Sequence, residues 1–198
     1  MQSIQTVSEN TIYVGASDRR LAKFENLFPI PRGVSYNAYV ILDEKTALLD
    51  TADASVGAQF LENVAAALDG RKLDYLIVDH MEPDHAAMIE AVLVRWPDLR
   101  LVVNAKTLPM LKMYFPTDSA AFDDALVVKE GDTLDLGKHK LTFVMAPMVH
   151  WPEVMMTFDT TTGTLFSADA FGTFGALEGA LFADEGDFAG KWLGDARR

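Results

Sequence analysis

The sequence predicts an α/β layered fold in which a sheet is buried beneath helices. Short continuous apolar runs alternate with amphipathic stretches through the middle of the chain, and strand-like runs flank them on both sides. The length of 198 residues suits one domain with a sizeable core. We therefore treat residues 1–198 as a single domain of the α/β class.

The N-terminal part is predicted to consist of strands followed by a helix. Residues 35–52 contain two apolar runs joined by a polar turn at residues 43–45, which is the pattern of a β-hairpin. A helix should begin at Asp53, a good capping residue, and end at Gly70. Its apolar face carries Val56, Phe60, Leu61, Val64 and Leu68.

Strands and helices are predicted to alternate in the middle of the chain. Residues 73–80 form a short apolar run that is typical of a strand buried on both faces. A helix is predicted over residues 84–96, ended by the proline that follows. Residues 99–105 predict another buried strand, and residues 107–115 a short helix.

The last third of the chain is predicted to be a series of strands and then a tail. The strand-like stretches are residues 125–136, 138–147 and 154–169, with turns at residues 130–132, 137–138 and 162–163. The tail beyond Gly172 is rich in glycine and acidic residues, and residues 190–198 have the pattern of an amphipathic helix.

Composition restricts the function. The chain has no cysteine, which excludes disulfides, thiolate-bound iron–sulfur clusters and zinc ribbons, so a metal must be held by His, Asp and Glu. The net charge of −12 argues against a nucleic-acid partner and suits either solubility or a basic partner face. No apolar run reaches the roughly twenty residues that cross a bilayer, and the N-terminus lacks signal-peptide features. We expect a cytoplasmic protein that does not bind membranes.

Ligand-type side chains cluster where a predicted strand meets a predicted helix. They are His80, Glu82, Asp84 and His85. Pro83 favours an extended conformation at Glu82, and residues two apart in an extended segment point the same way. His80 and Glu82 can therefore converge on one metal ion. The residues past the turn can reach a second ion, and such pairs are typically about 3.5–4 Å apart.

Two further residues, His150 and Asp169, follow the ends of other predicted strands. Taken singly, each has an ordinary explanation: a core histidine and a turn residue, with Asp84 as a helix cap. Their shared position at strand ends, where side chains from separate strands meet, favours a two-metal site instead. The fourth histidine, His139, lies in a predicted turn and is expected to be solvated.

The order HxExDH, then His150, then Asp169 resembles the metallo-β-lactamase superfamily, and within it the flavodiiron proteins. Most hydrolases of that superfamily have a second histidine where this chain has Glu82. A carboxylate at this position adds negative charge and oxygen donors, which favours iron or manganese over zinc. Further segments that match the flavodiiron pattern are residues 12–20, 31–51, 150–158 and 165–172.

The resemblance implies a metallo-β-lactamase-like αββα sandwich and a di-iron site. One iron would be held by His80, Glu82 and His150. The second would be held by Asp84 and His85, with Asp169 and a solvent-derived oxo or hydroxo group bridging the pair.

The resemblance also implies an activity and partners. The enzyme would reduce dioxygen to water or nitric oxide to nitrous oxide, with electrons delivered through FMN. A rubredoxin-like or other small electron donor and a head-to-tail homodimer or homotetramer are expected as well.

The sequence departs from the family pattern in its C-terminal part. The family's second iron takes one more histidine beyond Asp169, whereas this chain has none after His150, and the flavodoxin-like FMN domain is absent. We expect residues 1–198 to be an incomplete di-iron domain from a longer protein. A separate completing chain and a genuinely short gene product are the alternatives.

Two questions stay open at this point. The function could instead be that of a flavin-free di-iron oxygen sensor, or of a zinc hydrolase of the same superfamily. The bulky residues near the ligands line an apolar pocket for small gases or simply pack in the core, and the sequence favours neither. These residues are Met81, Met148, Trp151 and Phe171.

Overall fold

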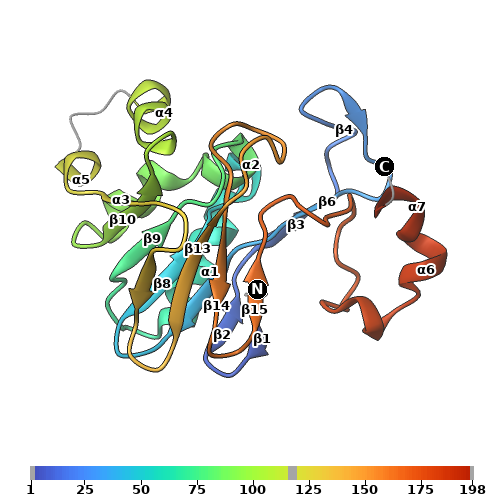
Figure 1. Cartoon of the computed structure of the whole chain (residues 1–198). Helices are drawn as coiled ribbons and strands as arrows, with labels where there is room; N and C mark the ends of the chain where they lie inside the picture. The colour runs from blue at the N-terminus through green and yellow to red at the C-terminus, as the bar shows by residue number, and fades with distance from the viewer. Residues whose placement is uncertain (1–2, 116–119, 197–198) are drawn as a thin grey trace.

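The computed structural model describes residues 3–115 and 120–196 (Figure 1). Within them, the larger sheet has the strand order β1-β2-β7-β8-β9-β10-β11. Its first four strands are antiparallel, and β8 to β11 are mutually parallel. Their bounds are β1 Gln5–Ser8, β2 Thr11–Tyr13, β7 Tyr39–Leu42, β8 Thr46–Leu49, β9 Tyr75–Ile77, β10 Arg100–Asn104 and β11 Leu126–Val128.

A second, antiparallel sheet has the order β12-β13-β14-β15 and packs on the first. Its strands are β12 Thr133–Asp135, β13 Lys140–Met145, β14 Met155–Asp159 and β15 Thr164–Phe166. The apolar layer between the sheets includes Ile41, Leu49, Ile77 and Val102 from the first sheet and Leu141, Phe143, Met155 and Phe166 from the second. Two small pairs flank the sheets: β3 Ala16–Asp18 with β6 Val34–Tyr36, and β4 Lys23–Phe24 with β5 Phe28–Pro29.

Helices cover the other face of the larger sheet and bury a second apolar layer. They are η1 Ala54–Val56, α1 Gly57–Leu68, α2 Pro83–Ala86, α3 Ile89–Arg95, α4 Thr107–Tyr114 and α5 Ala120–Asp123. The remaining helices, η2 Ala183–Glu185, α6 Phe188–Lys191 and α7 Leu193–Ala196, belong to the tail, and Figure 1 shows α6 and α7 at one end of the molecule. The predicted α/β layering is confirmed. Within the described part of the chain, no helix is both long and apolar enough to span a bilayer.

The predicted hairpin and the first predicted helix are confirmed. β7 and β8 pair across the turn at residues 43–45. The Asp53 side chain accepts a hydrogen bond from the backbone N–H of Ser55, at 2.7 Å, and so caps η1, which leads into α1. α1 ends just before Asp69, which adopts a left-handed conformation with φ of 46°.

The single helix predicted over residues 84–96 was wrong, because the segment forms two helices, α2 and α3. In a continuous helix, the His85 carbonyl would accept the N–H four residues later. Instead it accepts hydrogen bonds from the Thr51 N–H at 2.8 Å and from the Thr51 hydroxyl at 2.6 Å. The same hydroxyl oxygen accepts the N–H of Met88. Through these hydrogen bonds, Thr51 attaches the HxExDH segment to the end of β8.

The helix predicted over residues 190–198 is also interrupted, at Trp192 between α6 and α7, with residues 197–198 outside the described range. The Trp192 ring lies 4.3 Å below the Arg32 guanidinium. It also packs on Gly175, where a Cβ atom would meet the ring at 2.0 Å. These tertiary contacts of Trp192 hold the tail against the segment before β6.

Candidate metal centre

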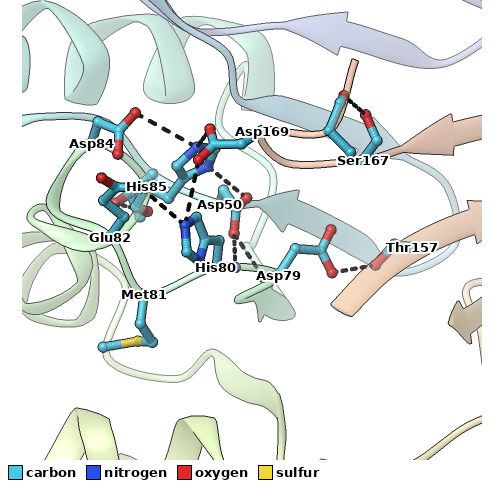
Figure 2. A network of polar contacts seen from close by, with 12 residues as sticks. Asp50, Asp79, His80, Met81, Glu82, Asp84, His85, Thr157, Ser167 and Asp169 are labelled. Carbon is cyan, nitrogen blue, oxygen red and sulfur yellow. Dashed lines mark hydrogen bonds and ion pairs between the residues drawn. The ribbon is translucent and has the colours of Figure 1, made fainter. Parts of the chain in front are cut away.

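All six predicted ligands converge at one end of the two sheets. Figure 2 labels five of them: His80, Glu82, Asp84, His85 and Asp169. His80 follows β9, and α2 carries Asp84 and His85. Glu82, just before α2, has the extended conformation that its position ahead of proline predicts, with φ −60° and ψ 145°. The other two residues come from the second sheet, His150 from the loop between β13 and β14 and Asp169 from the segment after β15.

One group of ligand atoms surrounds a point between the two sheets. The Glu82 Oε2 atom lies 3.1 Å from His80 Nε2 and 2.6 Å from His150 Nε2. The Asp169 Oδ2 atom lies 3.4 Å and 3.3 Å from the same two nitrogens. All four ligand atoms lie within 4.8 Å of one another, so one ion could bind them together.

A second group shares Asp169 with the first. His85 Nε2 lies 2.7 Å from Asp169 Oδ1 and 3.6 Å from Asp84 Oδ2. The two carboxylate oxygens of Asp169 therefore face different groups, Oδ2 the first and Oδ1 the second. This is the arrangement of a carboxylate that spans two ions.

The carboxylates give the centre a strongly negative electrostatic potential. Burial alone would lower the pKa of His80, but hydrogen bonds to carboxylates, among them Asp169 and Glu153, raise it to about 11. His85 behaves in the same way, with its pKa raised well above the usual range by Asp169 and Asp50 despite burial. These shifts mean that the pocket favours a positive charge between its carboxylates.

The donor set fits a cation at the second group as well. Burial raises the pKa of the Asp84 carboxyl to about 7. Its Oδ1 atom is buried and has no hydrogen-bond partner among the described residues. A bound metal would supply the missing partner and stabilise the ionised carboxylate.

Sequence reasoning missed the carboxylates behind the two buried histidines. Asp50, at the end of β8, places Oδ2 3.0 Å from His85 Nδ1 (Figure 2). Glu153 places Oε1 2.8 Å from His80 Nδ1. When Nδ1–H of each histidine donates to its carboxylate, Nε2 is unprotonated and its lone pair points into the centre, as metal ligation requires. The strand-end pattern could have found Asp50, whereas no sequence signal singles out Glu153.

A third missed carboxyl group lies at the mouth of the centre. Glu25 directly follows β4 and is close enough to Glu82 for the two carboxyl groups to interact. Partial burial and the neighbouring Glu82 charge raise its pKa.

The prediction that His139 is solvated was wrong. Its side chain is 1% exposed, and Nδ1 lies 2.8 Å from Asp159 Oδ2. The turn that carries it folds back onto Asp43, whose carboxylate accepts the His139 backbone N–H.

The four bulky residues near the ligands do not line one pocket in the described chain. Met81 is 2% exposed and belongs to the core beneath the helices, against which Trp151 packs. Met148 and Phe171 are instead 70% and 84% exposed. Core packing therefore accounts for Met81. The Trp151 ring also lies edge-on to His80, at 5.4 Å between ring centroids, so it borders the centre as well as the core.

Comparisons with known proteins agree with this geometry. The description "ODP family beta lactamase" matches residues 34–192. The chain is 38% identical over 183 residues to an anaerobic nitric oxide reductase flavorubredoxin of Klebsiella pneumoniae, covering 91% of this chain and 37% of that protein. It is also 38% identical over 169 residues to a putative diflavin flavoprotein A 1 of Thermosynechococcus vestitus, covering 84% of this chain and 28% of that protein.

Solved structures give the same result. The rubredoxin oxygen:oxidoreductase of Desulfovibrio gigas superposes with a TM-score of 0.88 at 30% identity, over 95% of this chain and 46% of that one. The flavodiiron protein of Giardia intestinalis gives a TM-score of 0.86 at 27% identity, over 96% and 45%. The predicted metallo-β-lactamase-like fold and the resemblance to flavodiiron proteins are thereby confirmed. The chain spans less than half the length of each of these proteins.

Proposed function

Because this chain belongs to the ODP family of beta-lactamase-like domains, we propose that it is the di-iron domain of an oxidoreductase. The reaction would be reduction of dioxygen to water, of nitric oxide to nitrous oxide, or of both. The names of two relatives, a nitric oxide reductase flavorubredoxin and a rubredoxin oxygen:oxidoreductase, support this class of reaction.

The observation that carries the proposal is the sharing of Asp169 between two ligand groups, one of which contains Glu82. In the proposed assignment, His80, Glu82 and His150 hold the first iron and Asp84 and His85 hold the second. Asp169 bridges the pair. Three carboxylates among six ligands suit iron better than zinc.

The iron pair would bind the diatomic gas and pass electrons to it. The chain's own residues prepare that site. Asp50 and Glu153 hold the buried histidines in the tautomer that ligates through Nε2. His150 is 56% exposed at its side chain, so the gas can enter on its side of the centre. The second group contains only Asp84, His85 and Asp169 among the described residues, which leaves coordination positions for the further histidine that the resemblance implies and for the substrate.

The electron path and the assembly are proposed from the resemblance. FMN would deliver electrons to the irons. A rubredoxin-like or other small redox protein would in turn pass electrons to the FMN. The names of the flavorubredoxin and of the rubredoxin oxygen:oxidoreductase support a rubredoxin-type donor. A head-to-tail homodimer or homotetramer in the cytoplasm completes the proposal.

The test is to load the purified protein with ferrous iron under argon, count metals, and follow gas consumption with reduced FMN as electron source. We expect two irons per chain and consumption of dioxygen or nitric oxide. Two bound zinc ions with turnover of a thioester or phosphodiester would instead identify a hydrolase. A stable dioxygen adduct without consumption would identify a sensor.

Glu82→His provides a matched variant, because it restores the ligand pattern of the hydrolases. We expect it to shift the preference of the first position from iron towards zinc and to lower gas reduction. Unchanged metal preference would contradict the role proposed for Glu82.

A further inference from the structure

Glu153 is a carboxylate buried behind the first ligand group. The residue is 1% exposed, and its Oε1 atom contacts both His80 Nδ1 at 2.8 Å and the backbone N–H of Met81 at 3.0 Å. Its Oε2 atom is buried and has no partner among the described residues. Burying an acidic side chain costs free energy unless hydrogen bonds compensate. The two hydrogen bonds of Glu153 therefore hold its carboxylate firmly against the HxExDH segment.

Glu153 also anchors the loop that carries His150. Its carbonyl oxygen accepts a hydrogen bond from Asn104 Nδ2, at the end of β10, at 2.5 Å. The carbonyl oxygen of the preceding residue, Pro152, accepts one from Lys106 Nζ at 3.0 Å. The loop is therefore attached to two neighbouring strand ends, through the Glu153 side chain to β9 and through its backbone to β10.

His150 needs this anchoring more than the other two histidines do. His80 and His85 each have a carboxylate behind Nδ1, whereas no contact to His150 Nδ1 is recorded among the described residues. Apart from the ligand-group contacts of Nε2 with Glu82 and Asp169 and the ring contacts with His80 and Trp151, the position of the His150 side chain depends on the backbone of its loop. Glu153 lies three residues further along that loop.

We propose that Glu153 is the positioning residue of the first metal position. It fixes the tautomer and orientation of His80 directly, and it seats the loop that presents His150. This inference rests on the proposed di-iron function, since it assigns Glu153 to one of the two ions. Asp50 is its counterpart behind His85, so the two positions depend on different carboxylates.

Loss of a carboxylate behind a ligating histidine typically lowers metal affinity about 10–100-fold. Because Glu153 supports two ligands of one ion, we expect Glu153→Ala to lie at the upper end of that range for the first iron. The second iron should keep its affinity. A carboxylate behind the imidazole also strengthens it as a donor, so the spectroscopic signature of the first iron should change even when iron is saturating.

The experiment compares wild-type protein with Glu153→Ala, Glu153→Gln and Asp159→Asn, each loaded with iron-57. Chelator competition gives the affinity of each iron, and Mössbauer spectra give the environment of each. Asp159→Asn is the matched control, because Asp159 is an equally buried carboxylate at 2.8 Å from a histidine Nδ1, remote from the centre. Glu153→Gln keeps the side-chain shape and decides the outcome if the alanine variant does not fold.

We expect both Glu153 variants to weaken one iron, by about 100-fold for alanine and about tenfold for glutamine, and to alter one of the two Mössbauer doublets. Asp159→Asn should leave both irons as in wild type. Wild-type affinity and spectra in both Glu153 variants would overturn the inference while leaving the di-iron function intact. Failure of the wild-type protein to bind iron would overturn both.

Discussion

Two buried histidine–carboxylate pairs lie at opposite ends of β13. His139 lies just before this strand and pairs with Asp159, and the loop after the strand carries Glu153, which pairs with His80. The distance from Nδ1 to the carboxylate oxygen is 2.8 Å in both pairs, and all four residues are buried. By residue type, contact distance and burial alone, the pairs cannot be told apart.

The difference lies at the second ring nitrogen. His80 Nε2 faces two further carboxylates, those of Glu82 and Asp169, whereas His139 Nε2 has no partner among the described residues. Asp159 is instead satisfied locally, by the hydroxyl of Thr162 and the backbone N–H of Thr161. The candidate metal centre is therefore distinguished from the structural pair by several acceptors that converge on one imidazole nitrogen.

The largest effect should come from Glu82→Ala, which removes a carboxylate from the converging set. We expect the loss of one iron per chain and of all reduction of dioxygen and nitric oxide, because the first ion loses its only non-bridging carboxylate. Iron analysis and gas electrodes measure both. Full iron content and activity in this variant would show that the ligand assignment is incorrect.

His139→Ala should affect stability alone. It leaves the Asp159 carboxylate buried without its imidazole partner, and breaking a buried pair in this way costs about 3–5 kcal/mol. Denaturant unfolding should show that loss in the free energy of unfolding, while the folded variant binds as much iron as wild type. Loss of iron at unchanged stability would mean that the His139–Asp159 pair is not purely structural and contributes to the metal centre.

Asp159→Asn should give a smaller effect that depends on pH. Burial raises the pKa of Asp159, but hydrogen bonds from Thr162 and His139 outweigh it and hold the pKa below the usual 3.8. A carboxylate with a lowered folded-state pKa stabilises the protein above the unfolded-state value and loses that contribution as the pH falls through the folded-state value. At pH 7 we expect the variant to lose about 1–3 kcal/mol.

The measurement is the free energy of unfolding from pH 7 down to pH 3. The difference between wild type and Asp159→Asn should stay constant above about pH 5 and shrink as the pH falls below 3.8. Asp135→Asn, at an exposed carboxylate of the neighbouring β12 strand, serves as the control and should show a smaller difference throughout. A gap that widens towards acid would contradict the sign given for Asp159.

The smallest effect should come from Lys106→Ala, beside the loop that carries His150. Lys106 is exposed, and its removal should change the free energy of unfolding by no more than about 0.5 kcal/mol. The affinity for the first iron should fall slightly, and less than in either Glu153 variant. An effect as large as that of Glu153→Ala would place the anchor of the loop at Lys106 instead.

The sequence predicted the strands and the six converging residues because both depend on local patterns. A ligand at a strand end needs only the apolar run before it and the topology rule that strand ends meet. The prediction for His139 was wrong because its side chain is buried through contacts with Asp43 and Asp159, which are remote in sequence. The break between α2 and α3 failed for the same reason, since Thr51 takes the His85 carbonyl from outside the helix. Glu153 could not be found at all, because its role depends on three elements that meet only in the folded chain.

The ligands of the centre come from both sheets: His80, Glu82, Asp84 and His85 follow β9 of the larger sheet, and His150 and Asp169 flank strands of the smaller one. In the proposed di-iron centre, neither sheet alone would supply a complete coordination shell, so high-affinity metal binding would require the two sheets to have packed together first. Ions bound in the proposed centre would then link the two sheets. The midpoint temperature of thermal denaturation should therefore rise with metal loading, and metal should be released when the sheets separate.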